Sequence, residues 1–348
     1  MARQSFPLVD LCKMIAAQMI VLHHLAWFGP MSDVAAAGMP WAADVQSWLA
    51  EFGRYAVAVF LVISGFLAAQ TLQSGHFVPT GRLLLDRYVR LVAPFAVALL
   101  LAIASTMLAR QWMTHDSIGM LPNLKQLLAH LLLVHDLMGF EALSAGVWYV
   151  AIDFQLYALL VGLLWLSGHL HSRLASVDFW VPVLVGGMAL ASLFYFNLDA
   201  AWDATALYFF GSYGLGVAAA WATRLSRPGV GLLMVAMTGG LALFDEFRPR
   251  IAVALATALL LGWGASLSLR LPPFLMQLSR HSYALFLVHF PVCLLVNAAV
   301  TRWVPDHVTL NAAGVVLAWL ASNIAASIFH RQVELRLGDW RLLRLKPA

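Results

Sequence analysis

Ten apolar runs, of which only the seventh is clearly shorter than a bilayer-spanning helix, decide what this chain can fold into. A transmembrane helix needs about 20 consecutive apolar residues to span the hydrocarbon core. The chain has 348 residues, of which 62% are hydrophobic and only 11% are charged, whereas soluble proteins use about 25% charged residues. The sequence therefore predicts an all-α, polytopic transmembrane helix bundle, with about ten spans over residues 8–28, 52–73, 89–110, 146–167, 179–197, 204–223, 229–244, 250–269, 281–301 and 309–330.

The connections between these spans show no domain boundary. The chain has no periodic repeat and no linker rich in glycine, serine or proline. We therefore expect one integral-membrane domain over residues 1–348. Arg3 precedes the first run and no small-residue cleavage site follows it, so we expect this run to remain in the membrane. Cys12 and Cys293 both lie in predicted spans, and we expect neither a disulfide framework nor a metal site.

The basic residues predict how the spans are oriented. With a cytoplasmic N-terminus, fourteen lysines and arginines fall on the inner side and six on the outer side. This bias follows the positive-inside rule and predicts that both termini are cytoplasmic. Two outer connections are long. We expect residues 29–51 to be partly irregular, and residues 111–145 to contain an amphipathic helix on the membrane surface. Whether they roof a cavity or only anchor the protein stays open.

The first run carries polar residues inside the predicted membrane. A charged group near the bilayer centre costs several kcal/mol unless it is paired or faces water, so such residues are functional candidates. Lys13 and His24 are eleven positions apart, which places them on one helix face, about 16 Å apart along the axis. His24 has the chemistry of a general base acting on a hydroxyl, and Lys13 that of a contact to an anion. His23 points about 100° away from His24.

Each of these residues also has a purely structural interpretation. Lys13 can extend its ammonium group to cytoplasmic water, and His24 can simply hydrogen-bond another helix. Arg87 and Arg90 lie three residues apart, on one face of the third span. Their guanidinium groups suit phosphate oxygens, although ordinary anchoring at the cytoplasmic surface would place arginines there as well.

The fourth predicted span contains Asp153, Gln155 and Tyr157. It runs from the outer to the inner side, which places Asp153 about 10 Å and His24 about 6 Å below the outer edge. These depths are compatible with contact, and an aspartate can orient a histidine and stabilise its protonated form. We therefore expect Asp153 to orient His24. A pair formed only for structure is the alternative.

The ninth predicted span adds a second intramembrane histidine. His289 stands two residues before Pro291, and proline removes a helix hydrogen bond and loosens the turn around it. His289 either contacts the cavity or bonds a neighbouring carbonyl. In the second span, Ser64 could act as a nucleophile, but no base motif accompanies it in the sequence.

Several functions are excluded by what the sequence does not contain. It has no Walker loop, dinucleotide fingerprint, paired-cysteine spacing or His-x-x-x-His pattern. We expect no metal ion and no nucleic-acid partner. The lipid bilayer is the one partner that the composition requires.

Several short motifs occur together in a recognisable order. They are Lys13 with His24, residues 60–66, Arg87-Tyr-Val-Arg90, the span from Trp148 to Tyr157, Ser282-Tyr283 with His289-Phe-Pro291, and Val333-Glu334. In this order and spacing the chain resembles the acyltransferase family 3 membrane proteins, which acylate glycans and other acceptors at the bacterial envelope. Lys13 stands where the family has arginine and Asp153 where it has glutamate. No fused extracytoplasmic hydrolase-like domain is recognisable.

This resemblance implies an enzyme of the inner membrane that transfers an acyl group. The donor would be cytoplasmic acyl-CoA, specifically acetyl-CoA, and the acceptor a hydroxyl of an envelope or exported glycan or glycolipid. Lys13, Arg87 and Arg90 would hold the CoA phosphates, and His24 with Asp153 would be catalytic. Supporting or substrate-binding residues would be Trp148, Gln155, Tyr157, Ser282, Tyr283 and His289.

Two other functions remain open from the residues alone. Lys13, His24 and Asp153 could form the proton relay of a transporter for a lipid-linked or small sugar, although no inverted repeat is evident. They could also only hold helices together in an assembly subunit.

Overall fold

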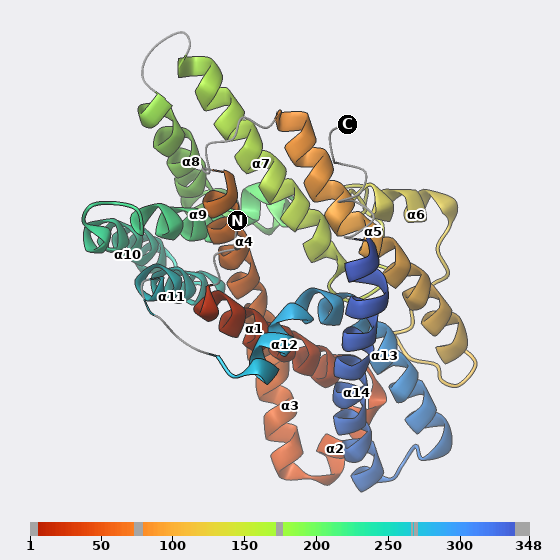
Figure 1. Cartoon of the computed structure of the whole chain (residues 1–348). Helices are drawn as coiled ribbons and strands as arrows, with labels where there is room; N and C mark the ends of the chain where they lie inside the picture. Colours follow the sequence, from red (N-terminus) through yellow and green to blue (C-terminus); the bar gives the residue numbers. More distant parts are fainter. Residues whose placement is uncertain (1–5, 73–78, 172–176, 266, 268–270, 338–348) are drawn as a thin grey trace. The chain divides into compact units, whose positions relative to one another are not determined.

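The computed structural model describes residues 6–72, 79–171, 177–265, 267 and 271–337, and these residues form helices and no β-strand (Figure 1). The α-helices are α1 (Pro7–Trp27), α2 (Pro30–Gly38), α3 (Pro40–Phe52), α4 (Ala56–Leu72), α5 (Thr80–Ala109), α6 (Leu124–Leu131), α7 (Val147–His171), α8 (Val177–Phe194), α9 (Ala206–Ala222), α10 (Pro228–Asp245), α11 (Pro249–Gly264), α12 (Pro273–Arg280), α13 (Ser282–Trp303) and α14 (Val308–Phe329).

The predicted spans are found as helices. In the described part of the chain, eight helical segments are long and apolar enough to cross a membrane, and α9 and α11 are shorter apolar helices. Together they match the ten predicted runs, and the polytopic helical bundle is confirmed. Six of the basic residues used for the orientation lie outside the described residues: Arg3, Arg173, Arg270, Arg341, Arg344 and Lys346.

The first long connection differs from the expectation of irregular structure. Residues 30–52 are almost entirely helical, in α2 and α3. Pro30 and Pro40 each begin a helix, where the missing N–H of proline costs no hydrogen bond. Gly29, with a φ of 117°, makes the turn between α1 and α2. The prolines therefore start helices here and do not interrupt them. The helix predicted within residues 111–145 is confirmed as α6.

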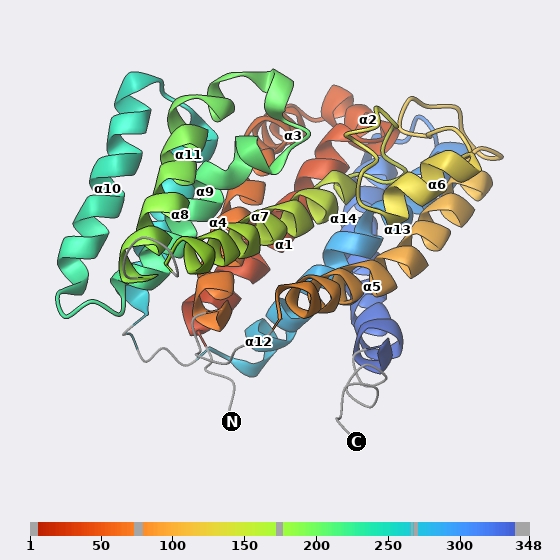
Figure 2. The same cartoon turned by 90° about the horizontal axis from the view of Figure 1, so that it is seen from above.

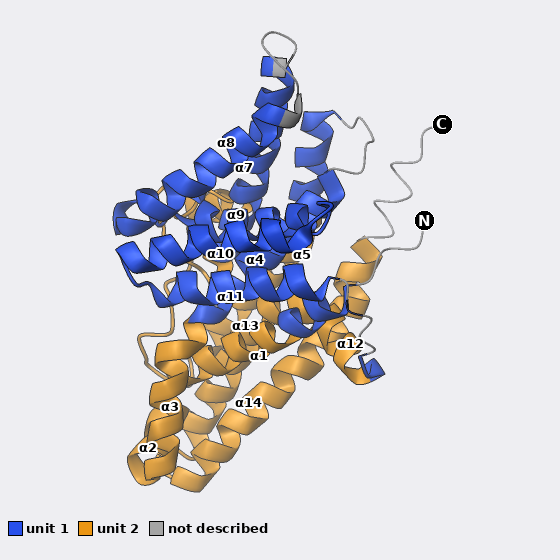
Figure 3. Ribbon diagram, turned by 90° about the vertical axis from the view of Figure 1, so that its left-hand side faces the viewer, with its two compact units in different colours: residues 1–13, 55–89, 149–273 blue, residues 14–54, 90–148, 274–348 orange. Residues whose placement is uncertain are grey.

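The chain forms two compact units that alternate along the sequence (Figure 3). Unit 1 contains residues 1–13, 55–89 and 149–273, and unit 2 contains residues 14–54, 90–148 and 274–348. Four continuous helices, α1, α5, α7 and α12, each contribute residues to both units. The assignment of a single domain stays a prediction.

In unit 1, α9 packs against α4, α8, α10 and α11 (Figure 2). The contact between α4 and α9 is close because glycines lie where the backbones meet. Gly65 faces the backbone carbonyl of Tyr213, and Gly216 faces that of Val62. Any side chain at either glycine would clash with backbone atoms, as expected where small residues allow membrane helices to approach.

In unit 2, α14 packs against α13 and α2. Buried polar side chains join these elements. Asn297 of α13 accepts a 3.2 Å hydrogen bond from the backbone N–H of Met31 in α2. Gln18 of α1 donates to Asn323 of α14 at 2.7 Å and accepts from the Trp319 indole at 2.8 Å. Such bonds hold helices together where apolar side chains gain nothing by leaving lipid.

Candidate active site

Two buried histidines form a pair in unit 2. Nδ1 of His24, in the last turn of α1, lies 2.7 Å from Nε2 of His289 in α13. The rings are nearly parallel, with centroids 5.0 Å apart and an angle of 11° between their planes. His289 is completely buried. Of the two alternatives for His289, the bond to a neighbouring carbonyl is observed, on Leu285, and the ring also contacts His24.

The backbone assigns the direction of this hydrogen bond. Nδ1 of His289 lies 2.9 Å from the carbonyl oxygen of Leu285, which can only accept, so the proton of neutral His289 is on Nδ1. Its Nε2 is then an acceptor, and His24 must donate from Nδ1. Neutral His24 therefore carries its lone pair on Nε2, the form of imidazole that can take a proton from a hydroxyl.

The surroundings of the His24 ring are apolar. Phe28 and Phe290 form edge-to-face contacts with it, with centroids 5.5 and 6.5 Å away. Gly146, with a φ of 84°, lies beside the ring, and a β-carbon there would stand 3.8 Å from Cε1 of His24. His23 points elsewhere, toward the Leu49 carbonyl of α3 at 3.0 Å. As expected, the side chains of His23 and His24 point to different partners.

Unit 1 contains a second polar cluster, built from three helices. Nη2 of Arg87, in α5, forms a 2.5 Å ion pair with Oδ2 of Asp153 in α7. The hydroxyl of Ser64, in α4, donates to Oδ1 of the same carboxylate and lies 3.2 Å from Nη2 of Arg87. The Asp153 side chain is 6% exposed and that of Arg87 25%. Each charge is thus paired, as an intramembrane charge must be.

Aromatic side chains surround this cluster. The Arg87 guanidinium lies over the Tyr157 ring, 5.2 Å from its centroid, in a cation–π contact. Tyr149 hydrogen-bonds Ser64. Tyr213 of α9 interacts electrostatically with both Arg87 and Asp153. Among the described residues, the Tyr213 hydroxyl and Nε of Arg87 are buried without a hydrogen-bond partner.

These contacts differ from one pairing expected from the sequence. Asp153 was expected to orient His24, but the structure bonds Asp153 to Arg87 and Ser64 and gives His24 the partner His289. The expected phosphate contact of Arg87 stays a prediction, and one of its terminal nitrogens binds Asp153. Depth along the helices, the only information used for the His24–Asp153 pair, did not specify which side chains face each other.

The other predicted residues lie in varied surroundings. Lys13 is half-buried on α1 and Arg90 is exposed on α5. Gln155 accepts a 3.1 Å hydrogen bond from the backbone N–H of Ala206, which begins α9. The Tyr283 hydroxyl donates to the Leu91 carbonyl at 2.9 Å. Gln155 and Tyr283 therefore hold helices in place. Of the remaining predicted residues, Trp148 lies in the first turn of α7, and Ser282 is buried at the start of α13.

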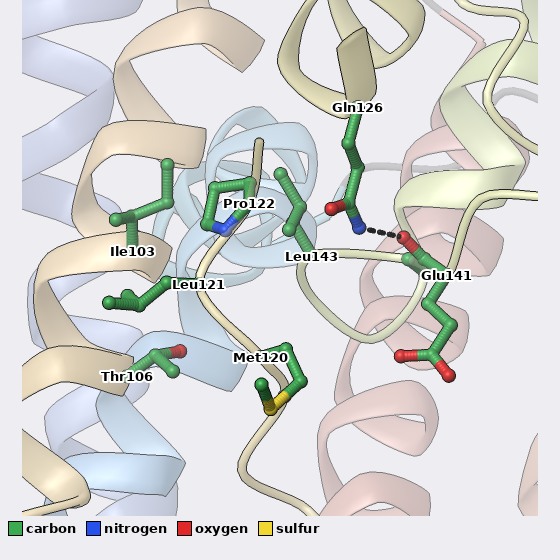
Figure 4. A pocket seen from close by; sticks show the side chains of 10 residues that line it. Ile103, Thr106, Met120, Leu121, Pro122, Gln126, Glu141 and Leu143 are labelled. Atoms are coloured by element: carbon green, nitrogen blue, oxygen red, sulfur yellow. Dashed lines mark hydrogen bonds between the residues drawn. The ribbon is translucent and has the colours of Figure 1, made fainter. Parts of the chain in front are cut away.

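The connection that contains α6 has a small pocket and two buried histidines. The pocket, about 20 Å³ in volume, lies between α5 and residues 119–143, where the Gln126 amide donates to the Glu141 carbonyl (Figure 4). It can hold a water molecule and little more. His130 and His135 stack with centroids 4.0 Å apart and are fully buried. Burial lowers the pKa of each to about 4.

The end of α14 contains the closing Val-Glu pair of the sequence motifs. Residues His330–Glu334 form a π-helical turn, in which the Glu334 carboxylate binds Nδ1 of His330 at 2.8 Å. Val333 lines an open groove of about 420 Å³ between this turn and Val97 of α5. The His330 ring also contacts His281, with centroids 4.8 Å apart.

The family model for the acyltransferase domain of acyltransferase 3 proteins matches residues 6–330. The chain belongs to the acyltransferase 3 family. No curated protein and no solved structure matches the chain. The protein is thus a multi-pass membrane protein of an acyltransferase family, which implies an acyl donor and an acceptor.

Membership in the acyltransferase 3 family gives the two polar clusters a chemical context. His24 and His289 come from two of the motifs, and Arg87 and Asp153 from two others. Sequence reasoning missed the bond between His24 and His289 and the place of Ser64 beside Asp153. The residues of each cluster are far apart in the chain, and no local spacing could have paired them.

Proposed function

We propose that this protein is an O-acyltransferase of the cytoplasmic (inner) membrane that moves an acetyl group from cytoplasmic acetyl-CoA to a hydroxyl of an envelope or exported glycan. Membership in an acyltransferase family supports the reaction type. The observation that carries the proposal further is the neutral His24, held by His289 with its lone pair on Nε2. A hydroxyl acceptor must lose a proton during acylation, and His24 is suited to take it.

In this proposal, His24 acts on the acceptor and His289 positions it. His289 accepts the Nδ1 proton of His24, which fixes the ring and its tautomer. When Nε2 takes the acceptor proton, the positive charge of the imidazolium is shared with His289 through the same hydrogen bond. The apolar rings of Phe28 and Phe290 keep the imidazole out of bulk water, where the base would compete with solvent.

The basic residues near the predicted cytoplasmic ends of α1 and α5 would bind the donor. Arg90 is exposed and Lys13 half-buried, and both can contact CoA phosphates. Arg87 keeps its Nε without a partner among the described residues, so it can still donate one hydrogen bond to the donor while Nη2 holds Asp153. Asp153 would then act in donor binding, by holding Arg87 in place.

The test is acyl transfer in membranes that contain the protein. Inverted vesicles from cells with and without it are supplied with acetyl-CoA, and envelope glycans and glycolipids are analysed by mass spectrometry. We expect one species to gain one acetyl group with the wild-type protein and none with His24→Ala present at the same level. His23→Ala is the matched control. Sugar flux without any acyl-CoA requirement would instead identify a transporter and overturn the proposal.

A further inference from the structure

The Ser64 hydroxyl does not bond a carbonyl of its own helix, as several other helical hydroxyls of the described residues do. Within a helix, serine and threonine commonly bond a carbonyl one turn earlier in their own helix. Thr71, Ser167 and Ser322 do so, with distances of 2.7–2.8 Å to Leu67, Leu164 and Ala318. The Ser64 hydroxyl is instead directed to a carboxylate on another helix. It is also partly exposed, whereas Asp153 is buried.

The hydrogen bonds around Ser64 fit an activated oxygen. Its single proton is donated to Asp153, so Arg87 and Tyr149 must both act as donors to Oγ. The two donors stabilise negative charge on Oγ, and the Asp153 carboxylate accepts the proton. A nucleophilic serine requires this combination of an adjacent base and a stabilised oxyanion. The sequence offered Ser64 no base, and the fold supplies one from α7.

Two unused donors lie at the same cluster. Nε of Arg87 and the hydroxyl of Tyr213 are buried and lack partners among the described residues, and Tyr213 interacts electrostatically with both charges of the Arg87–Asp153 pair. A buried donor without a partner costs free energy. Donors aimed at a developing oxyanion are how enzymes stabilise the tetrahedral intermediate of acyl transfer.

We propose that Ser64 is the nucleophile that receives the acyl group from acyl-CoA, forming a serine ester on α4 before the acceptor is acylated. The proposal rests on the proposed function, because it needs an acyl-CoA donor. It adds a covalent intermediate and a catalytic residue to that function.

Each half of the reaction balances. In the first, Oγ of Ser64 attacks the thioester carbonyl, Asp153 takes the serine proton, and the carbon–sulfur bond breaks to release CoA as its thiolate. Arg87 stabilises the oxyanion between these events. In the second, the acceptor oxygen attacks the ester carbonyl and gives up its proton to a general base. The bond to Oγ breaks, and Oγ recovers the proton held by Asp153. The proton from the acceptor is finally released to water.

Covalent trapping tests this step. Purified full-length protein in lipid vesicles is mixed with radiolabelled acyl-CoA, chosen among the acetyl, propionyl and butyryl forms as the one that wild-type membranes consume. The His24→Ala variant should block the second half-reaction. We expect it to accumulate one acyl group on the peptide that contains Ser64, released by alkaline hydroxylamine as an ester is. His24→Ala/Ser64→Ala should carry no label, and His24→Ala/Ser167→Ala should carry as much as His24→Ala.

A further variant keeps the test valid if Ser64→Ala folds poorly. In His24→Ala/Ser64→Cys the label should move to the thiol and become labile to neutral hydroxylamine. Wild-type acyl transfer together with an unlabelled Ser64 peptide in His24→Ala would overturn the covalent intermediate and leave the proposed function standing. So would full acyl transfer by Ser64→Ala. If wild-type membranes consume none of the acyl-CoAs, the proposed function fails, and the intermediate with it.

Discussion

His289 lies 2.7 Å from His24 and accepts its Nδ1 proton, while the other nitrogen of His289 is fixed on the Leu285 carbonyl. One backbone oxygen thereby determines the tautomer of two rings. The arrangement resembles the way an acidic side chain orients a catalytic histidine, with the difference that the orienting group is neutral. A neutral partner holds the ring without attracting a proton to it, which leaves His24 free to act as a base.

Replacing His289 should separate orientation of His24 from simple packing. His289→Gln can still accept from His24 through its amide oxygen, whereas His289→Leu cannot. We expect kcat to fall at least about tenfold in His289→Leu and less in His289→Gln, with KM for acyl-CoA little changed in both, because a base contributes about 10²–10⁴-fold only when it is positioned. Steady-state CoA release measures this. Equal losses in the two variants would indicate a packing role only.

The ion pair between Arg87 and Asp153 should contribute to stability as a unit. Removing one partner of a fully buried pair costs about 3–5 kcal/mol, because the other charge stays buried alone. Since a quarter of the Arg87 side chain is exposed (25%), we expect Asp153→Asn to cost less than this range, though clearly more than Asp116→Asn at an exposed site. Thermal unfolding in detergent measures the difference.

A double variant sharpens this measurement. Arg87→Gln/Asp153→Asn removes both charges, so its loss of unfolding temperature should be smaller than the sum of the two single losses. Strict additivity would mean that the two side chains do not depend on each other and would contradict the pairing.

The sequence predicted features that depend on neighbouring residues, and it did not predict contacts between residues far apart in the chain. The ten apolar helices follow from composition and length, and α6 follows from the leucine spacing within residues 124–132. The two site pairings depended on which faces of separate helices meet. Depth along the axis made Asp153 a plausible partner for His24, but it does not specify how each helix is rotated about its axis. In the structure Asp153 faces Arg87 and Ser64, and Ser64 lies on α4, whose packing on α9 is fixed by contacts such as Gly65 on Tyr213.

Gly65 should tolerate no side chain. A β-carbon there would lie well inside contact distance of the Tyr213 carbonyl, so α4 and α9 would have to separate next to Ser64. We expect Gly65→Ala to lower stability by about 1–3 kcal/mol and to reduce activity. Gly187→Ala on α8, with nothing within 4 Å of its β-carbon, is the control and should leave both unchanged. Unfolding temperature and CoA release report the outcome, and a fully stable Gly65→Ala would argue against this close packing.

The connection containing α6 should loosen in acid. Burial lowers the pKa of His130 and His135 to about 4, against about 6.5 in an open chain. Between these values the open state binds more protons, so the free energy of opening decreases as pH falls, by up to about 1.4 kcal/mol per pH unit for each histidine. Asp136, with Oδ2 3.6 Å from Nε2 of His135, moderates the effect. Hydrogen exchange of residues 111–146 from pH 7 to 4 measures it.

Removing one histidine should reduce this pH dependence by about half. In His135→Leu only His130 still titrates, whereas His307→Gln at an exposed site should leave the pH dependence unchanged. Exchange rates in the wild-type connection that change with pH only as the intrinsic rates do would contradict the buried, neutral histidine pair.

If His24 acts as the base in acyl transfer from acyl-CoA to a hydroxyl, its removal must abolish acylation of the acceptor. Envelope glycans and glycolipids are analysed by mass spectrometry after inverted membranes containing wild-type, His24→Ala or His23→Ala protein at equal levels have been supplied with labelled acetyl-CoA. We expect one labelled acetyl group on one species with wild-type and His23→Ala protein, and at least about a hundredfold less with His24→Ala. Undiminished acetylation by His24→Ala would contradict it.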